Sequence, residues 1–202
     1  MSESSTVDFY FDVGSPYTYL AATQIDGLVE RTGATVVWKP MLLGGVFQLT
    51  GNAPPARVAA KGKWMLSDLS LWAERYGVPF HMNPHFPVNT LSAQRALTAA
   101  EELHGQEAMQ KLARVFMDGM WVERADMSDG DELAFRVNRA GGDAGKLMRR
   151  VGEDELKQKL KDVTQEAVDR GAFGSPSFFV GERLFFGNDR LDLLERHLKP
   201  QA

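Results

Sequence analysis

The stretch Val7-Asp8-Phe9-Tyr10-Phe11-Asp12-Val13-Gly14-Ser15-Pro16-Tyr17 decides the fold of this chain. Its first residues alternate between two faces and are rich in aromatic and β-branched types, which predicts a β-strand. Gly14 permits a tight turn, Ser15 suits the N-cap of a helix, and Pro16 suits the first helical position. The stretch therefore predicts a strand that leads through a glycine turn into a helix.

Ser15 is the first candidate functional residue. The start of a helix presents free N–H groups and the positive end of the helix dipole, and this environment favours an anion. Two interpretations of Ser15 stay open on this basis: it caps the helix and does nothing more, or its hydroxyl contacts a bound anionic group.

Composition bounds the class of protein. The chain has 202 residues, of which 44% are hydrophobic and 25% charged, which predicts one domain or one domain with a large insertion. A net charge of -4 argues against a nucleic-acid partner. No apolar run reaches the roughly 20 residues that span a bilayer, so we expect no membrane partner. The short polar start resembles no signal peptide, and we expect a cytoplasmic protein.

The chain contains no cysteine, which excludes disulfides, thiolate metal sites and any thiol chemistry of its own. Four histidines remain. Among them, His81 and His85 lie in a loop rich in proline and asparagine, with no third metal ligand close in sequence. We interpret them as solvated loop side chains and predict no metal site.

The order of the predicted elements indicates the fold. A helix from Ser15 to about Thr32 follows the first strand, and Thr35–Trp38 forms a second strand parallel to it. The glycine- and proline-rich segment 41–57 is predicted to be irregular apart from a short helical turn at Val46, Phe47 and Leu49, and to be either a ligand loop or a plain connection. Helical stripes then recur from Met65 to Ala167.

A β-hairpin and a helix complete the pattern. Residues 177–180 and 183–186 are predicted strands joined by the turn Gly181–Glu182, and a last helix over 191–197 begins at Asn188 or Asp189 as its N-cap. This order predicts an α/β protein with a thioredoxin-like fold that carries an all-helical insertion domain. We expect residues 1–45 and 170–202 to form the thioredoxin-like domain and residues 46–169 the helical insertion.

Five motifs carry a resemblance to a known family. They are Asp8–Asp12 with Ser15-Pro16-Tyr17, residues 43–47 with 51–55, residues 83–89, Phe173-Gly174-Ser175-Pro176, and Phe186-Gly187-Asn188-Asp189-Arg190. Taken in this order, the five motifs are distributed over nearly the whole chain. The sequence resembles the 2-hydroxychromene-2-carboxylate isomerases and kappa-class glutathione transferases, which belong to the DsbA-like thioredoxin superfamily.

The resemblance implies an enzyme that uses glutathione, usually as a homodimer with a small-molecule substrate. It implies cis-trans isomerisation by reversible addition of the glutathione thiolate to the substrate, in the degradation of aromatic compounds. Ser15 is the implied catalytic residue. The implied glutathione contacts are Ser15, Pro16, Tyr17, Asn52, Lys61, Ser175, Pro176 (in a cis peptide bond), Asn188, Asp189 and Arg190. The implied substrate contacts are Phe47, Arg57 and Phe86.

Two alternatives stay open beside the isomerase. One is a kappa-class glutathione transferase or peroxidase, which consumes glutathione. The other is a non-catalytic glutathione-binding protein. A disulfide oxidoreductase is excluded, because Ser15-Pro16-Tyr17-Thr18 stands where redox relatives carry Cys-x-x-Cys.

Overall fold

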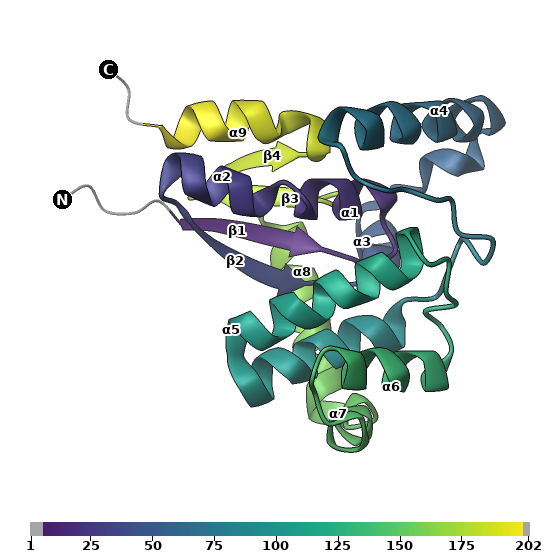
Figure 1. Cartoon of the computed structure of the whole chain (residues 1–202). Coiled ribbons are helices and arrows are strands. Elements are labelled where there is room, and N and C mark those ends of the chain that lie inside the picture. The colour runs from purple at the N-terminus through teal and green to yellow at the C-terminus, as the bar shows by residue number, and fades with distance from the viewer. Residues whose placement is uncertain (1–5, 200–202) are drawn as a thin grey trace.

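One mixed sheet forms the centre of the molecule. The structure is a computed structural model, and it describes residues 6–199. Four strands, β1 (Thr6–Phe11), β2 (Thr35–Pro40), β3 (Ser177–Val180) and β4 (Arg183–Phe186), lie in the order β2-β1-β3-β4 (Figure 1). Strand β1 is parallel to β2 and antiparallel to β3, and β3 and β4 form the predicted hairpin.

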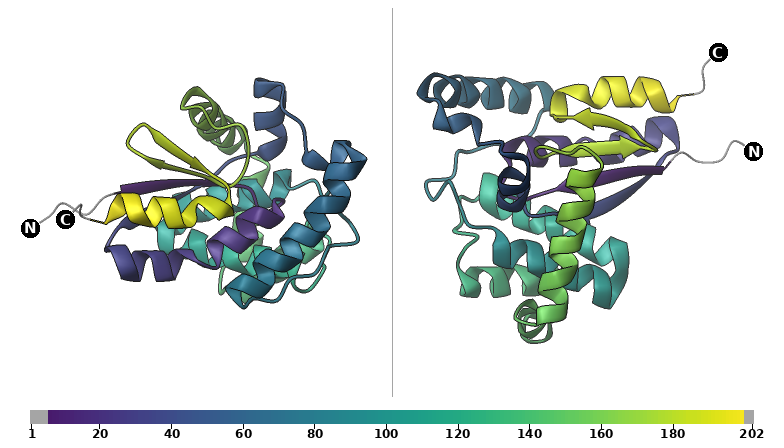
Figure 2. Two further views of the ribbon diagram at one scale, coloured as in Figure 1. Left: turned by 90° about the horizontal axis from the view of Figure 1, so that it is seen from above. Right: turned by 180° about the vertical axis from the view of Figure 1, so that it is seen from behind.

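Helices cover both faces of this sheet. They are α1 (Pro16–Ala22), α2 (Ile25–Thr32), α3 (Leu43–Thr50), α4 (Ala59–Tyr76), α5 (Leu91–Trp121), α6 (Gly130–Arg139), α7 (Ala144–Val151), α8 (Asp154–Asp169) and α9 (Leu191–Leu198). Two short 3-10 turns, η1 (Pro55–Arg57) and η2 (Asn188–Arg190), precede α4 and α9. Helices α1, α2 and α9 lie on one face, and α3 and α8 lie on the other (Figure 2). This arrangement confirms the predicted α/β thioredoxin-like fold.

The alternation of β1 divides the core between the two faces. Phe9 and Phe11 point into the larger core, where they stack on each other and meet Trp38 edge to face. Tyr10 points to the other face, into a smaller core that also contains Ala167 of α8. The larger core joins residues of the sheet to residues of α5. The division of the chain into a thioredoxin-like domain and a helical insertion over residues 46–169 stays a prediction.

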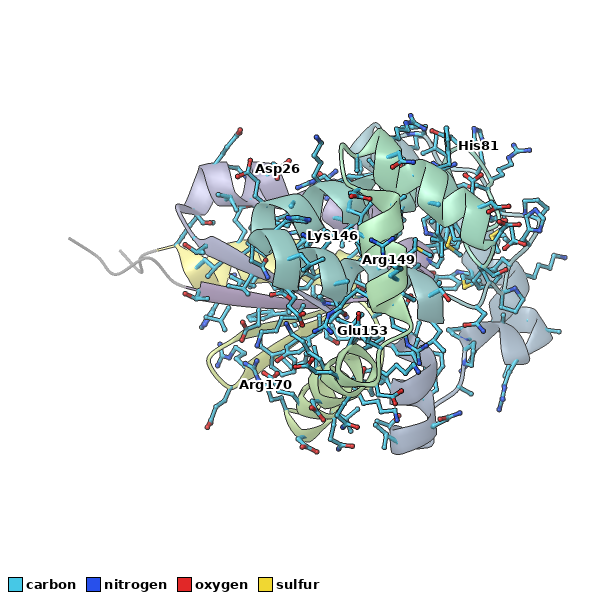
Figure 3. The ribbon with its side chains drawn as sticks, turned by 90° about the horizontal axis from the view of Figure 1, so that it is seen from below. Asp26, His81, Lys146, Arg149, Glu153 and Arg170 are labelled. Atoms are coloured by element: carbon cyan, nitrogen blue, oxygen red, sulfur yellow. The ribbon has the colours of Figure 1, made fainter. Side chains whose placement is uncertain are left out.

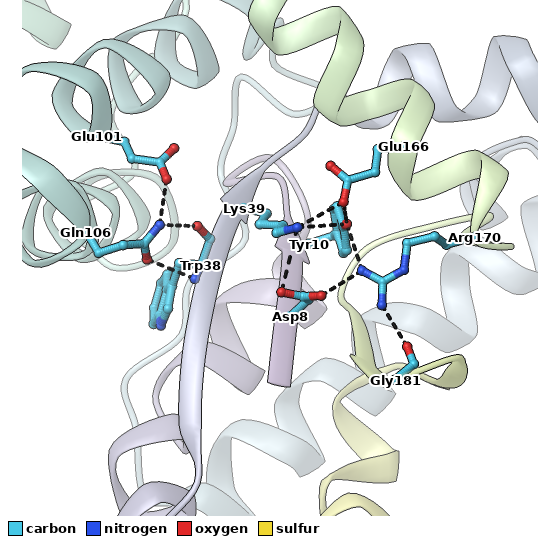
Figure 4. A network of polar contacts seen from close by, with 9 residues as sticks. All are labelled: Asp8, Tyr10, Trp38, Lys39, Glu101, Gln106, Glu166, Arg170 and Gly181. Atoms are coloured by element: carbon cyan, nitrogen blue, oxygen red, sulfur yellow. Dashed lines mark hydrogen bonds and ion pairs between the residues drawn. The ribbon is translucent and has the colours of Figure 1, made fainter. Parts of the chain in front are cut away.

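A polar network fastens α8 to its face of the sheet (Figure 4). The Tyr10 hydroxyl donates to Glu166 over 2.6 Å and accepts from Arg170 over 2.9 Å. Lys39 of β2 also pairs with Glu166, at 2.9 Å. Arg170 pairs with Asp8 of β1 at 2.7 Å. These bonds fix the end of α8, from which the chain turns back into β3.

The structure corrects two predicted elements near the start of the chain. The helix predicted from Ser15 to Thr32 is two helices, separated by a turn at Thr23 and Gln24. In this turn the Thr23 hydroxyl donates to the Leu20 carbonyl, and the Gln24 N–H donates to the Ala21 carbonyl instead. The segment predicted to be irregular contains the regular helix α3. A Cβ atom at Gly45 would lie 3.2 Å from the Thr164 side chain, so the glycine lets α3 approach α8 closely.

The start of the last helix also differs from its prediction. Neither Asn188 nor Asp189 is the N-cap of α9, because both residues lie within η2, and Arg190 occupies the cap position without a side-chain bond. No helix within residues 6–199 is both long enough and apolar enough to span a membrane.

Candidate functional site

The turn into α1 holds Ser15 in contact with the loop before β3. Ser15 is the N-cap of α1, with extended backbone angles, and its side-chain oxygen accepts from the Thr18 N–H over 3.3 Å. The same hydroxyl donates to the carbonyl oxygen of Ser175 over 2.9 Å. Only 4% of Ser15 is exposed. Both interpretations of Ser15 therefore stay open, because the residue caps the helix and also contacts the loop before β3.

Helix α5 fixes Val13, the residue before Gly14 in this turn. The Val13 N–H donates to the side-chain oxygen of Gln94 over 3.4 Å, and the Val13 carbonyl accepts from the Trp121 indole over 2.8 Å. The Gln94 amide also donates to the carbonyls of Phe11 and Met41, each over 2.8 Å. One buried glutamine thus joins the ends of β1 and β2 to the turn that presents Ser15.

The Asp12 carboxylate supports the same turn from beneath. It accepts from the Gly14 N–H and from the Leu43 N–H, each over 2.8 Å. Burial raises the pKa of Asp12 above its ordinary value, and the hydrogen bonds from Leu43, Gly14 and the Thr90 side chain partly lower it. Since Leu43 begins α3 and Thr90 precedes α5, Asp12 connects the starts of three helices.

The loop before β3 contains a cis peptide bond between Ser175 and Pro176, as expected from the resemblance. The Ser175 side-chain oxygen accepts from the Asp12 N–H over 3.0 Å and lies 2.6 Å from the Thr18 hydroxyl. Within residues 6–199, no acceptor faces the backbone N–H of Ser175 or that of Tyr17. Two open N–H groups and one serine hydroxyl therefore meet at the start of α1, a donor set that suits an anionic group.

The turn η2 adjoins this loop. The Gly187 N–H donates to the Pro176 carbonyl over 3.0 Å, and the Tyr76 hydroxyl donates to the Asn188 carbonyl over 3.0 Å. Gly187 has a φ of +98°, and a Cβ there would lie 2.5 Å from the Asp189 carboxylate. The carboxylate of Asp189 accepts from Arg190 over 2.6 Å.

Two more predicted contacts are tied to neighbouring segments. The Asn52 amide donates to the Phe173 carbonyl over 2.8 Å, which brings the loop after α3 to the loop before β3. The Tyr17 hydroxyl donates to Asp68 of α4 over 2.8 Å. Burial, and then the charges of Asp68 and Asp189, raise the pKa of Tyr17 above its ordinary value.

The structure thus bonds Ser15 to Ser175, and it bonds Pro176 to Gly187, the residue before Asn188. Tyr17 and Asn52 lie on segments that adjoin this region. No described hydrogen bond or ion pair joins Lys61 to Ser15, and Lys61 is exposed in the first turn of α4. The predicted substrate residues are dispersed. Phe47 lies on α3 and Arg57 on η1, while the Phe86 ring lies 5.9 Å from that of Trp121.

Four residues that hold the site were missed in the sequence. Thr18 stands where the second cysteine of a Cys-x-x-Cys motif would be, which was a usable signal because a buried hydroxyl there faces the same loop. Gln94 is a fully buried polar residue on the apolar face of α5, one turn before the buried Thr98. For Trp121, and for the bond between Asp12 and Leu43, only the folded chain reveals the partners, because they lie far apart in sequence.

Within residues 6–199, the charged and histidine side chains outside this site form no metal-binding cluster. No group of three or more potential metal ligands occurs within the described part of the chain. His85 approaches Asp126 at 3.7 Å, and both are well exposed. Lys146 and Arg149 of α7 and Glu153 at the start of α8 are also exposed, on the underside of the molecule (Figure 3).

Comparisons with known proteins agree with this fold. A family profile described as DSBA-like thioredoxin domain matches residues 6–199. A 2-hydroxychromene-2-carboxylate isomerase of Sphingobium xenophagum is 32% identical over 197 residues, which cover 96% of this chain and 98% of the relative. The glutathione S-transferase kappa 1 of Homo sapiens is 29% identical and covers 94% and 88%. The solved structure of a 2-hydroxychromene-2-carboxylate isomerase superposes with a TM-score of 0.87 at 24% identity, covering 96% and 94%.

Proposed function

The chain belongs to the DsbA-like thioredoxin family, together with 2-hydroxychromene-2-carboxylate isomerases and kappa-class glutathione transferases, and we propose that it is a glutathione-dependent isomerase. Its substrate in this proposal is a conjugated 2-oxo or hemiketal acid from aromatic degradation. The observation that carries the proposal is the contact between the Ser15 hydroxyl and the cis Ser175–Pro176 peptide, at the open start of α1.

The donor set at α1 fits a thiolate. Glutathione supplies the reactive sulfur, which a chain without cysteine lacks. Ser15 donates its hydroxyl hydrogen to that sulfur, and the Tyr17 N–H adds a second donor at the positive end of α1. Both favour the anionic form, so the thiol pKa falls from the value of about 8.5 for a free cysteine. Pro16 fixes the first helical position next to the hydroxyl.

The remaining predicted contacts divide by the part of glutathione that each recognises. Ser175 and Pro176 receive the cysteinyl backbone. Asn188, Asp189 and Arg190 receive the charged γ-glutamyl end, and Asn52 contacts the peptide from the opposite loop. Lys61 attracts the acidic glycyl end. Phe47, Arg57 and Phe86 receive the second substrate, with the Arg57 guanidinium as the partner of its carboxylate.

A kappa-class glutathione transferase or peroxidase is the second candidate. It is supported by the near-equal identity of this chain to relatives with both names, 32% for the isomerase and 29% for the transferase. A non-catalytic glutathione-binding protein is the third candidate, since the same residues could bind glutathione without turnover.

Three measurements test these candidates. Calorimetric titration with glutathione should show one binding site per chain, and an absence of heat at millimolar glutathione would exclude all three. A 2-hydroxychromene-2-carboxylate should then isomerise while the concentration of glutathione stays constant. Loss of free thiol with an aryl halide, without isomerisation, identifies the transferase instead. Binding without either reaction identifies the non-catalytic protein.

We further propose that the protein acts as a homodimer in the cytoplasm, and that residues 46–169 form the inserted helical domain. The homodimer predicts a molecular mass near twice 22.4 kDa by light scattering. A mass equal to that of one chain at all concentrations would contradict it.

A further inference from the structure

The Ser15 hydroxyl already uses its hydrogen within the protein. A serine hydroxyl has one hydrogen to donate, and in Ser15 this hydrogen goes to the Ser175 carbonyl over 2.9 Å. The oxygen of Ser15 also accepts from the Thr18 N–H. The proposed function requires this same hydrogen for the sulfur of glutathione. Binding must therefore change the partner of the Ser15 hydroxyl.

Ser175 cannot easily turn its carbonyl away. Its side-chain oxygen is held by the Asp12 N–H at 3.0 Å and by the Thr18 hydroxyl at 2.6 Å. The next carbonyl along the chain, that of Pro176, is held by the Gly187 N–H at 3.0 Å. Thr18 is fully buried, and Ser175 is 7% exposed. The change of partner is thus a rotation of the Ser15 hydroxyl rather than a movement of the loop.

A released carbonyl needs another donor. The Ser175 carbonyl is buried, and a buried acceptor without a partner is unfavourable. Within residues 6–199, the Ser15 hydroxyl is the only donor that bonds the Ser175 carbonyl. The replacement has to come from the bound molecule.

A cysteinyl residue carries such a donor close to its sulfur. In antiparallel pairing, one residue exchanges both an N–H and a carbonyl bond with one residue of the partner strand. The Ser175 N–H is open within residues 6–199, and its carbonyl is the group that Ser15 occupies. A residue that pairs with Ser175 therefore brings its own N–H to that carbonyl, and in cysteine the sulfur is three bonds from that nitrogen.

On the basis of the proposed function, we propose that glutathione releases Ser15 itself: its cysteinyl N–H takes over the Ser175 carbonyl, and the freed Ser15 hydroxyl turns to the sulfur. The exchange couples activation of the thiol to recognition of the peptide. A small thiol without a peptide N–H leaves Ser15 on Ser175 and remains poorly activated. The site thereby selects cysteinyl peptides over simple thiols.

Carbonyl resonances report the exchange directly. The measurement uses protein labelled with carbon-13 at the Ser175 carbonyl, as wild type and as Ser15→Ala, each free and saturated with glutathione. Without glutathione, the two proteins should differ at Ser175, because only the wild type has the Ser15 donor. With saturating glutathione, the two resonances should coincide. A difference that persists under saturation means that Ser15 still holds Ser175, and it overturns the proposal.

A modified peptide tests the coupling to acidity. Glutathione methylated on its cysteinyl nitrogen keeps the thiol and lacks the N–H, and the ultraviolet absorbance of the thiolate gives the thiol pKa of each bound peptide. The wild type should ionise glutathione about tenfold more readily than the methylated peptide, a difference of about one pKa unit. Ser15→Ala should remove this difference. Equal acidity of the two peptides in the wild type contradicts the proposal.

Failure of the proposed function gives a separate result. If glutathione does not bind, no Ser175 resonance moves and no heat is released, whatever Ser15 does. If glutathione binds and the exchange is absent, the resonance and calorimetric changes appear without the predicted coincidence. Ser177→Ala is the matched control, because its hydroxyl donates over 2.9 Å to the Gly174 carbonyl of the same loop. It should leave the difference between the two peptides unchanged.

Discussion

The Ser15 hydroxyl and the Ser175 carbonyl oxygen lie 2.9 Å apart, although 160 positions separate the two residues in the sequence. This bond joins the helix start to the loop that enters the antiparallel half of the sheet. Any ligand at the start of α1 therefore meets both segments together. The reactivity of the site depends on how firmly the start of α1 and the loop before β3 are each held in place.

Replacing Ser15 with alanine tests the proposed activation of the sulfur. The variant lacks the hydroxyl donor, so the thiol pKa of bound glutathione should rise toward about 8.5. Turnover should fall about 10²- to 10³-fold, as when one donor to a developing anion is removed. Loss of the cap should lower the free energy of unfolding by about 1 kcal/mol. Ultraviolet titration, rate measurements and urea unfolding give the three quantities.

Ser177→Ala separates the role of Ser15 from general support of the loop. Ser177 is fully buried and also donates to a carbonyl of this loop. It should lose a similar amount of stability, about 1 kcal/mol, while the thiol pKa stays at its wild-type value. An equal rise of the thiol pKa in both variants would show that loop geometry, rather than the Ser15 hydroxyl, sets the acidity.

A pair of glycine variants tests the role of Asp189. Gly187 and Gly171 have nearly the same backbone angle, with φ of +98° and +99°. Alanine at either position should lower stability by about 1–3 kcal/mol, because side chains rarely adopt this conformation. Only at Gly187 does the new Cβ meet the Asp189 carboxylate, at 2.5 Å. Gly187→Ala should therefore also weaken glutathione binding, which calorimetry measures.

The glycine comparison has a clear contrary result. Within 4 Å of a Cβ at Gly171 there is no other heavy atom of the described chain, so Gly171→Ala should change stability alone. If both variants bind glutathione as tightly as the wild type does, Asp189 has no part in binding.

Much of the fold follows from local patterns in the sequence. The alternation in β1, the Gly181–Glu182 hairpin turn and the Ser15-Pro16 helix start are all visible there, and all are confirmed. Only a short helical turn was predicted where α3 forms, because its Gly44-Gly45 pair is locally typical of a break in regular structure. Only the close approach to Thr164, and the Asp12 carboxylate at the helix start, explain why these residues are helical.

The candidate site divides in the same way. The motifs pointed to Ser15 and Ser175, and the fold brings these two residues together. The supporting residues Gln94 and Trp121 could not be predicted from the sequence. Each forms a hydrogen bond with Val13 across a long stretch of sequence, 81 and 108 positions respectively. Such partners depend on how α5 packs, and no local pattern encodes that packing.

Gln94→Leu tests whether α5 positions the turn. The substitution removes the bonds to the Met41 carbonyl and to the Val13 N–H, while the Phe11 carbonyl keeps its bond from the Met41 N–H. At about 1–3 kcal/mol for each of these two unsatisfied groups, the free energy of unfolding should fall by at least about 2 kcal/mol. Glutathione affinity should fall as well, as calorimetry on the folded variant measures. Gln110→Leu, which loses only a bond to Gln106 on the same helix, should leave both quantities nearly unchanged.

The buried Asp12 carboxylate should give stability an unusual dependence on pH. Burial raises its pKa above the ordinary value of 3.8. A group with a raised pKa binds its proton more tightly in the folded state, so its contribution is fully present below the unfolded pKa and is lost as pH rises through the folded pKa. Urea unfolding should show that the stability of the wild type relative to Asp12→Asn falls as pH rises from about 4. A flat difference would contradict the raised pKa.

Glu166 should show the opposite slope in the same experiment. Burial tends to raise the pKa of Glu166, but the hydrogen bonds from Tyr10 and Lys39 outweigh it and hold the pKa below 4.5. The unfolded chain then binds the proton more tightly, so this contribution is present above 4.5 and is lost as pH falls through the folded pKa. The stability of the wild type relative to Glu166→Gln should therefore rise with pH over this acidic range. Parallel slopes for the Asp12 and Glu166 variants would show that a general effect of acid, rather than these two carboxylates, governs the pH dependence.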